Sequence, residues 1–135
     1  MLQCVVFKKY FTPKEANQTL HIVKKIVTEI LEKGRSLRAL LSGQIGDVPA
    51  PQTQTLAKEV EGLMLQLEEI GCFYKDWNFE TGLVDFPAMI DGEEALLCWR
   101  SDEGEILWYH SLEDGFAGRR PLPAEWLLGD LFRNK

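Results

Sequence analysis

The feature that most constrains the fold is a heptad-like spacing of apolar residues near the N-terminus. Small or apolar positions recur at alternating intervals of four and three: Ala16, Leu20, Val23, Val27, Ile30, Gly34, Leu37 and Leu41. This spacing places them on one face of an α-helix, as in a coiled-coil seam. The helix is predicted to begin at Thr12-Pro13-Lys14-Glu15. These residues match a capping box, with proline at the first helical position.

A second heptad segment follows a loop. Residues 42–52 contain two glycines and two prolines, which cannot continue a helix. From about Thr53 or Thr55 the spacing resumes at Leu56, Val60, Leu63, Leu67 and Ile70, and Gly71 predicts the helix end. Two such helices predict an antiparallel helical hairpin. The first would be roughly 43 Å long and the second roughly 27 Å. The longer helix must therefore pack on something else at one end, or break at Gly34.

The apolar period changes after residue 71, where the pattern becomes that of strands. Asp91-Gly92 is a hairpin signal, and Ser101 to Gly104 matches a four-residue hairpin loop. These turns predict a three-stranded antiparallel meander at residues 83–90, 93–100 and 105–110, with an optional fourth strand at 72–76. The predicted fold is α+β: a single domain over residues 1–135, with the hairpin of 12–71 packed on the sheet and arginine-containing loop of 72–123, and a short helix at 124–133.

Counting residues outward from the two turns predicts the strand register. Asp85 then lies beside Cys98 on one face of the sheet, and His110 lies on the other face. No Asp85–His110 pair is expected unless a bulge intervenes. Pro87 is compatible with the first strand only if that strand lies at the edge of the sheet, because proline has no N–H to donate. Both faces carry apolar side chains. In a sheet with one solvent-exposed face, apolar and polar residues alternate more strictly along each strand. We therefore expect the second face to be covered by the C-terminal segment or by another subunit.

The net charge of −6 is divided unevenly along the chain. Residues 1–43 hold eight basic and three acidic side chains, and residues 44–135 hold seven and eighteen. We interpret this division as attraction between the two helices. The basic side of the first carries Lys24, Lys25, Lys33, Arg35 and Arg38, and the acidic side of the second carries Glu59, Glu61, Glu68 and Glu69. A basic surface neutralised in this way is not expected to bind nucleic acid.

Targeting and cysteine content point to an intracellular protein. No apolar run approaches the roughly 18–20 residues that span a bilayer, and the N-terminal apolar stretch is too short for a signal peptide. The three cysteines, Cys4, Cys72 and Cys98, are widely spaced and form no C-x-x-C pair. A disulfide framework or a cysteine zinc site is therefore not expected. We expect reduced thiols in or near a core and a cytoplasmic location.

Five polar residues stand out because their neighbours are apolar or glycine: Asp85, His110, Asp114, Arg119 and Arg120. The adjacent arginines could hold a carboxylate or phosphate, and His110 could act as a base or ligand. The favoured alternative is structural, with Arg119 paired to Asp85, Asp114 or a backbone carbonyl. No metal site is expected, because His110-x-x-x-Asp114 supplies only two local ligands. No catalytic residue or cofactor is predicted either, since a carboxylate beside Cys98 disfavours its thiolate.

An ordered set of motifs supports these predictions. It comprises Phe11 to Asn17, Lys75-Asp76, Gly82-Leu83-Val84-Asp85-Phe86-Pro87, Leu97-Cys98-Trp99-Arg100, Trp108-Tyr109-His110 and Gly115 to Leu122. The set resembles the bacterial and archaeal domain-of-unknown-function 2203 family over nearly the whole chain, although Tyr109 stands where Trp is expected more often. That family has no assigned activity, so the resemblance supports the fold and implies no reaction.

Two functional hypotheses follow. The first is a non-enzymatic interaction or scaffold module that self-associates as a homodimer or higher homo-oligomer, because isolated heptad seams bury poorly without a partner. The second is a small-molecule or anion-binding protein, enzymatic or not, with a site around His110, Asp114, Arg119 and Arg120.

Overall fold

The structure is a computed structural model that describes residues 7–42 and 50–127. Its elements are α1 (Pro13–Leu41), α2 (Ala50–Ile70), β1 (Phe73–Tyr74), β2 (Leu83–Ile90), β3 (Glu93–Arg100), β4 (Trp108–Ser111), the 3-10 turn η1 (Phe116–Gly118), β5 (Arg120–Pro121) and α3 (Ala124–Leu127). The strands form one antiparallel sheet in the order β1-β2-β3-β4-β5. The predicted α+β class, with a helical hairpin and a sheet, is confirmed.

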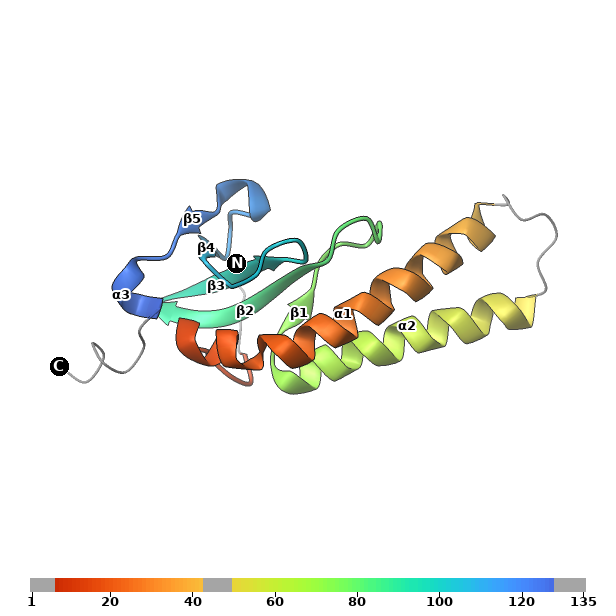
Figure 1. The fold of residues 1–135 in the computed structure, drawn as a ribbon, viewed down its shortest axis with the longest axis horizontal. Coiled ribbons are helices and arrows are strands. Elements are labelled where there is room, and N and C mark those ends of the chain that lie inside the picture. Colours follow the sequence, from red (N-terminus) through yellow and green to blue (C-terminus); the bar gives the residue numbers. More distant parts are fainter. Residues whose placement is uncertain (1–6, 43–49, 128–135) are drawn as a thin grey trace, which may run out of the picture.

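The helical hairpin is longer than the sheet that it supports. The start of α1 and the end of α2 lie against the sheet, and the opposite end of the hairpin extends beyond it (Figure 1). The capping box predicted for α1 is present: the Thr12 hydroxyl accepts from the Glu15 N–H, and the Thr12 N–H donates to the Glu15 carboxylate. The helix then continues through Gly34 to Leu41.

The second helix begins earlier than the sequence predicted. We expected a start at Thr53 or Thr55, and α2 begins at Ala50. The physical reason is that Pro51 lies in the first turn, where the missing N–H of proline has no helical acceptor in any case. The Thr55 hydroxyl donates to the Pro51 carbonyl and so becomes part of the helix rather than its cap.

The first two strands of the meander have the predicted register. Ile90 lies opposite Glu93 and Asp85 opposite Cys98. The predicted third strand, at residues 105–110, is present, but its predicted start and register were wrong. β4 begins at Trp108, and its register places Trp108 opposite Cys98 and His110 opposite Leu96. The observed pairing differs by one residue from the predicted one. A one-residue shift moves every side chain of a strand to the other face.

Asn17 on α1 explains the shift. The backbone N–H of Ile106 donates to the Asn17 Oδ1 at 2.7 Å, and the Asn17 Nδ2 reaches the Ile106 carbonyl at 3.2 Å. Both polar backbone groups of Ile106 are thus satisfied by a helix instead of by β3. The loop between β3 and β4 extends through Leu107, and Ile106 is fully buried within the core.

Both faces of the sheet bury side chains at its centre, although Met89 at the end of β2 is 50% exposed. The face toward the helices presents Val84, Phe86, Leu97 and Trp99, all at most 1% exposed. On the opposite face the described side chains include Leu96 and Cys98, which are also buried. Pro87 is not on an edge strand, because β2 lies between β1 and β3. It is accommodated because the short β1 pairs only with Val84 and Asp85.

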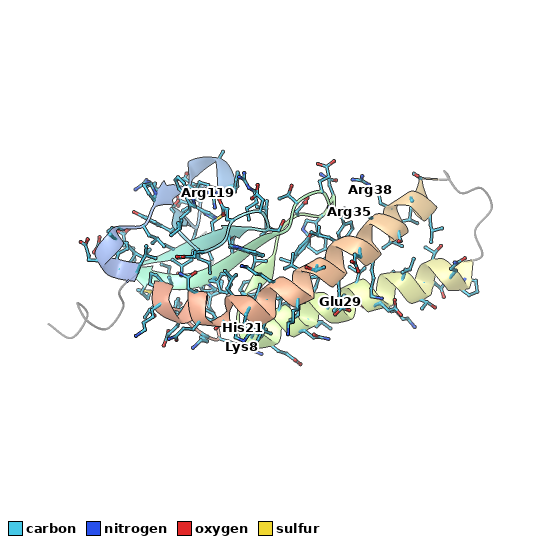
Figure 2. All side chains as sticks on the ribbon, in the orientation of Figure 1. Lys8, His21, Glu29, Arg35, Arg38 and Arg119 are labelled. Carbon is cyan, nitrogen blue, oxygen red and sulfur yellow. The ribbon has the colours of Figure 1, made fainter. Side chains whose placement is uncertain are left out.

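The charge division has a different explanation from the one inferred from the sequence. Among the described residues, one ion pair links the two long helices, Lys33 to Glu59 at 3.2 Å. Arg35 and Arg38 instead donate to backbone carbonyls of residues 78–80, in the loop between β1 and β2. Figure 2 shows both arginines on the side of α1 that faces this loop.

Several predictions concern residues outside the described ranges. Cys4 and the predicted helical residues 128–133 lie outside them. Cys72 and Cys98 are both buried, and they form no disulfide with each other. Among the described helices, none is long and apolar enough to cross a membrane.

Candidate functional site

The second face of the sheet brings together a carboxylate, a thiol and an imidazole. Asp85 on β2 lies directly opposite Cys98 on β3, and His110 on β4 lies on the same face. One ligand atom from each residue lies within 4.8 Å of the other two. All three residues are at most 5% exposed. Three strands therefore each contribute one buried, chemically reactive group to one point in the protein.

The pairing of Asp85 with His110 corrects the sequence analysis. The predicted register placed them on opposite faces, whereas His110 Nε2 lies 3.3 Å from Asp85 Oδ1. The Asp85–Cys98 pair was predicted, but without His110 it suggested neither a catalytic site nor a metal site. The shift set by Asn17 and Ile106 moves the imidazole to the face of the other two groups.

The hydrogen bonds of His110 define where its protons lie. Nδ1 is 2.8 Å from the backbone carbonyl oxygen of Ser111. A carbonyl oxygen only accepts, so Nδ1 must carry a proton and donate it. In a neutral imidazole Nε2 would then present a lone pair toward the Asp85 carboxylate, which is repulsive when that group is ionised. With an ionised Asp85, the arrangement favours a cation at Nε2, either a second proton or a metal ion.

The electrostatic environment favours such a cation. Hydrogen bonds with Asp85 and Cys98 raise the pKa of His110 to about 10 and outweigh the opposing effect of burial. These contacts favour the protonated form of the imidazole in the metal-free protein. Burial of an ion pair is costly unless each charge has partners. Here Asp85 and the Ser111 carbonyl supply them.

The distances also suit a metal ion. Two ligands bound tetrahedrally at about 2.0–2.1 Å, the range for nitrogen and oxygen on Zn²⁺, lie roughly 3.3–3.4 Å apart. The Nε2–Oδ1 separation of 3.3 Å matches this distance. It is longer than the roughly 2.7–2.9 Å of charge-assisted hydrogen bonds. The imidazole and the carboxylate are thus spaced like two ligands of one ion, and the Cys98 Sγ lies within 4.8 Å of both. No other such group of three occurs within residues 7–42 and 50–127.

Arg119 is engaged by protein groups beside this cluster. Its guanidinium forms two hydrogen bonds with the Glu103 carboxylate, at 2.7 and 3.0 Å, and a third with the Cys98 carbonyl at 3.0 Å. It also lies 4.9 Å from the Trp108 ring centroid and 4.3 Å from that of Phe116. Figure 2 shows Arg119 at the sheet end of the molecule, far from Arg35 and Arg38. The guanidinium secures the loop after β4 to the sheet.

The remaining two candidates do not join the cluster. Asp114 is exposed in the loop after β4, and its backbone N–H donates to the Ser111 hydroxyl. Arg120 is exposed on β5, opposite Tyr109. Of the five residues named from the sequence, the structure brings together Asp85 and His110. The proximity of His110 to Cys98 and the pairing of Arg119 with Glu103 were missed, and the predicted pairing of Cys98 with Asp85 was the available signal for the first.

Comparison with known proteins identifies a family. The family model described as "Uncharacterized conserved protein (DUF2203)" matches residues 9–122, a range that includes all three cluster residues. No curated protein and no solved structure matches the chain. Because the matched range covers most of the sequence, the chain belongs to the DUF2203 family of uncharacterized conserved proteins.

Proposed function

We propose that this protein binds one transition-metal ion of the Zn²⁺ type through Asp85, Cys98 and His110. The observation that carries the proposal is the orientation of His110. Its Nδ1–H donates to the Ser111 carbonyl, so Nε2 faces Asp85 and Cys98. A metal-binding histidine typically donates its other ring N–H to a carbonyl or carboxylate in this way.

The donor set favours Zn²⁺ over harder ions. A thiolate and an imidazole suit zinc, whereas Mg²⁺ and Ca²⁺ prefer oxygen ligands. Three protein ligands leave one position of a tetrahedral shell for water or another small ligand. Because the ligands come from β2, β3 and β4 and are buried, the ion would cross-link three strands. We infer a structural role, in which binding adds directly to the folding free energy.

Metal titration of the chelator-treated protein tests this proposal. We expect one equivalent of Zn²⁺ to bind in calorimetry, and Co²⁺ to give a thiolate charge-transfer band. At a free Zn²⁺ concentration of 100 times Kd, unfolding should require about 2.7 kcal/mol more than in the metal-free protein. Cys98→Ser should weaken Zn²⁺ binding by more than about a hundredfold, since loss of an outer-shell partner alone costs 10–100-fold.

Cys72→Ser is the matched control. Cys72 is equally buried, but it lies outside the cluster, and burial raises the pKa of its thiol to about 12. Both variants are made in a Cys4→Ser background, so that each retains a single thiol. Zinc affinity should survive Cys72→Ser. Equal Zn²⁺ affinity of the two variants, or no Zn²⁺ binding by the wild-type protein, would contradict the proposed metal site. The cation at Nε2 of His110 would then be a second proton.

We also propose that copies of the chain self-associate through the far end of the hairpin. The heptad seam of α1 is buried as far as Gly34, but beyond it Leu37 and Leu40 are only half-buried and Leu41 is 68% exposed. A cavity of about 730 Å³ is lined there by residues of both helices: Ala39, Leu40 and Leu56, together with the polar Arg35, Ser36, Gln52 and Thr55. Within residues 7–42 and 50–70, the hairpin leaves these apolar side chains partly exposed, and exposed apolar surface of this kind favours a further helical partner.

Light scattering over a range of concentrations tests the association. We expect a dimer or larger species at micromolar concentration and a monomer for Leu41→Asp. Met89→Asp is the control, because Met89 is also half exposed but lies in the sheet at the opposite end of the molecule. A strict monomer at high micromolar concentration would contradict the proposal.

An anion-binding site around Asp114, Arg119 and Arg120 is not proposed. Arg119 is already paired with Glu103, and the exposed Asp114 and Arg120 lie apart from it.

A further inference from the structure

A separate cavity of about 570 Å³ lies at the end of the sheet nearest α3. Its walls come from the segment that leads into α1, the turn between β2 and β3, and α3. Figure 1 shows these three parts together at one end of the molecule. The volume lies in the range of small-molecule sites, roughly 300–1,000 Å³. None of the proposed metal ligands lines this cavity.

The cavity wall is partly aromatic. Tyr10, Phe11 and Trp126 line it, together with Met89 and Ile90. Phe11 is buried, and the Lys9 ammonium lies 4.9 Å from its ring centroid, so this ring already has a cationic neighbour. Tyr10 is 38% exposed and Trp126 is partly buried. Tyr10 also packs on Phe7 and Trp126 on Tyr109, with centroid distances of 5.9 and 6.0 Å, and both rings line the cavity.

The charged lining is acidic. Asp91 and Glu125 are the ionisable carboxylates of the wall, and the described lining contains no lysine or arginine. In the part of the chain that the structure describes, neither carboxylate has an ion-pair partner. The Tyr10 hydroxyl donates to the Glu94 carboxylate, which adds negative charge behind the ring. Among the described residues, the wall therefore combines aromatic rings with two carboxylates that form no ion pair.

The start of α1 does not reverse this preference. A helix N-terminus attracts anions through its free N–H groups and its dipole. Here Pro13 has no N–H, and the Glu15 N–H is bound to the Thr12 hydroxyl. The Glu15 carboxylate, in turn, accepts from the Thr12 N–H and places a negative charge at the helix end.

We propose that this cavity binds a small organic cation, an ammonium group that carries apolar substituents. The aromatic faces of Tyr10 and Trp126 attract a cation through their ring electrons. Asp91 and Glu125 add Coulombic attraction, while Met89 and Ile90 contact the apolar substituents. A quaternary ammonium ion fits best, since it has no N–H group that would need a hydrogen-bond acceptor.

Calorimetry with two ligands of the same shape tests the proposal on the full chain. Choline carries the charge, and 3,3-dimethyl-1-butanol replaces its nitrogen by carbon. We expect choline to bind about tenfold more tightly, within the range of cation–π attraction. Equal affinities would show an apolar cavity only and would overturn the proposal, as would the absence of choline binding.

Variants and a local probe place the ligand. Glu125→Gln should weaken choline binding about threefold, and Trp126→Leu, which keeps apolar volume without a ring, should abolish the preference over the neutral ligand. Glu113→Gln is the control, because Glu113 is an exposed carboxylate that does not line the cavity. With fluorotryptophan in the protein, choline should shift the fluorine resonance of Trp126 and leave that of the buried Trp99 in place. A response from Trp99 alone would contradict the assigned site.

Discussion

Arg119→Ala is expected to lower the free energy of unfolding by about 3 kcal/mol, although this residue follows a glycine-rich loop. The guanidinium is held by Glu103 through two hydrogen bonds and by the Cys98 carbonyl through a third. The two charged side chains are only 11% and 17% exposed. Removal of one partner leaves the other charge buried and unpaired. Total stability is typically about 5–15 kcal/mol, so this loss would be large.

Arg120→Ala is the matched control for this experiment. The two arginines are adjacent in the sequence, but Arg120 is exposed and forms no ion pair in the described part of the chain. Its replacement should change stability by no more than about 0.5 kcal/mol. Arg119→Lys should recover only part of the loss, because an ammonium cannot reproduce the planar, two-pronged contact. Urea denaturation gives all three values. Similar losses of unfolding free energy for Arg119→Ala and Arg120→Ala would contradict a stabilising role of the Arg119–Glu103 pair.

The same pair should make stability acid-sensitive. Burial alone would raise the pKa of Glu103, but the hydrogen bonds and charge of Arg119, with smaller contributions from Arg100, lower it below its ordinary value of 4.5. A carboxylate with a lowered folded-state pKa stabilises the protein above its ordinary pKa and loses this contribution as pH falls through the folded-state value. The difference between wild type and Arg119→Ala should therefore be largest near pH 7 and shrink below about pH 4. A constant difference would argue against the Glu103 contact as its origin.

Gly34→Ala is expected to destabilise the protein by about 2 kcal/mol, even though alanine is the better helix former by about 1 kcal/mol. A Cβ at this position would overlap the ring of Phe79. The ring cannot easily withdraw, because Phe79 is buried, stacks on Tyr74 with a centroid distance of 6.2 Å, and has its carbonyl bound by Arg35.

Gly62→Ala should have the opposite sign. Gly62 is also inside a helix, α2, but a Cβ there would meet nothing within 4 Å. This substitution should therefore stabilise the protein by about 0.5–1 kcal/mol. Thermal or urea unfolding of both variants checks the pair. In addition, Phe79→Leu should relieve part of the cost of Gly34→Ala in a double-mutant cycle. Stabilisation by both glycine replacements would show that Phe79 does not occupy the space beside Gly34.

Helix periodicity, capping and turn signals predicted the fold well because each depends on interactions between residues that are close together in the sequence. The heptad spacing gave both helices, and the Thr12 capping box gave the start of α1. The Asp91-Gly92 turn, with Asp91 and Gly92 at φ 54° and 82°, set the register of β2 against β3. Each of these signals depends on residues that lie close together in the sequence. Turn geometry and helix periodicity are therefore readable without the rest of the protein.

The candidate site was only half predictable for the same reason. Asp85 and His110 were both named as candidates, but their meeting depends on the register of β4. That register follows from the contact between Asn17 and Ile106, which are 89 residues apart. No local turn signal encodes such a contact. The contacts of the basic residues on α1 are a similar case, because Arg35 and Arg38 donate to carbonyls 45 and 40 residues further along the chain.

The sequence by itself therefore determined the class of fold, the two long helices, the central hairpin of the sheet and the family of the chain. The tertiary structure decided which groups face one another: His110 with Asp85 and Cys98, Arg119 with Glu103, and Gly34 with Phe79. The physical reason is the two-residue period of a strand. Local sequence fixes the alternation of side chains, but one long-range hydrogen bond decides which half of them faces the site.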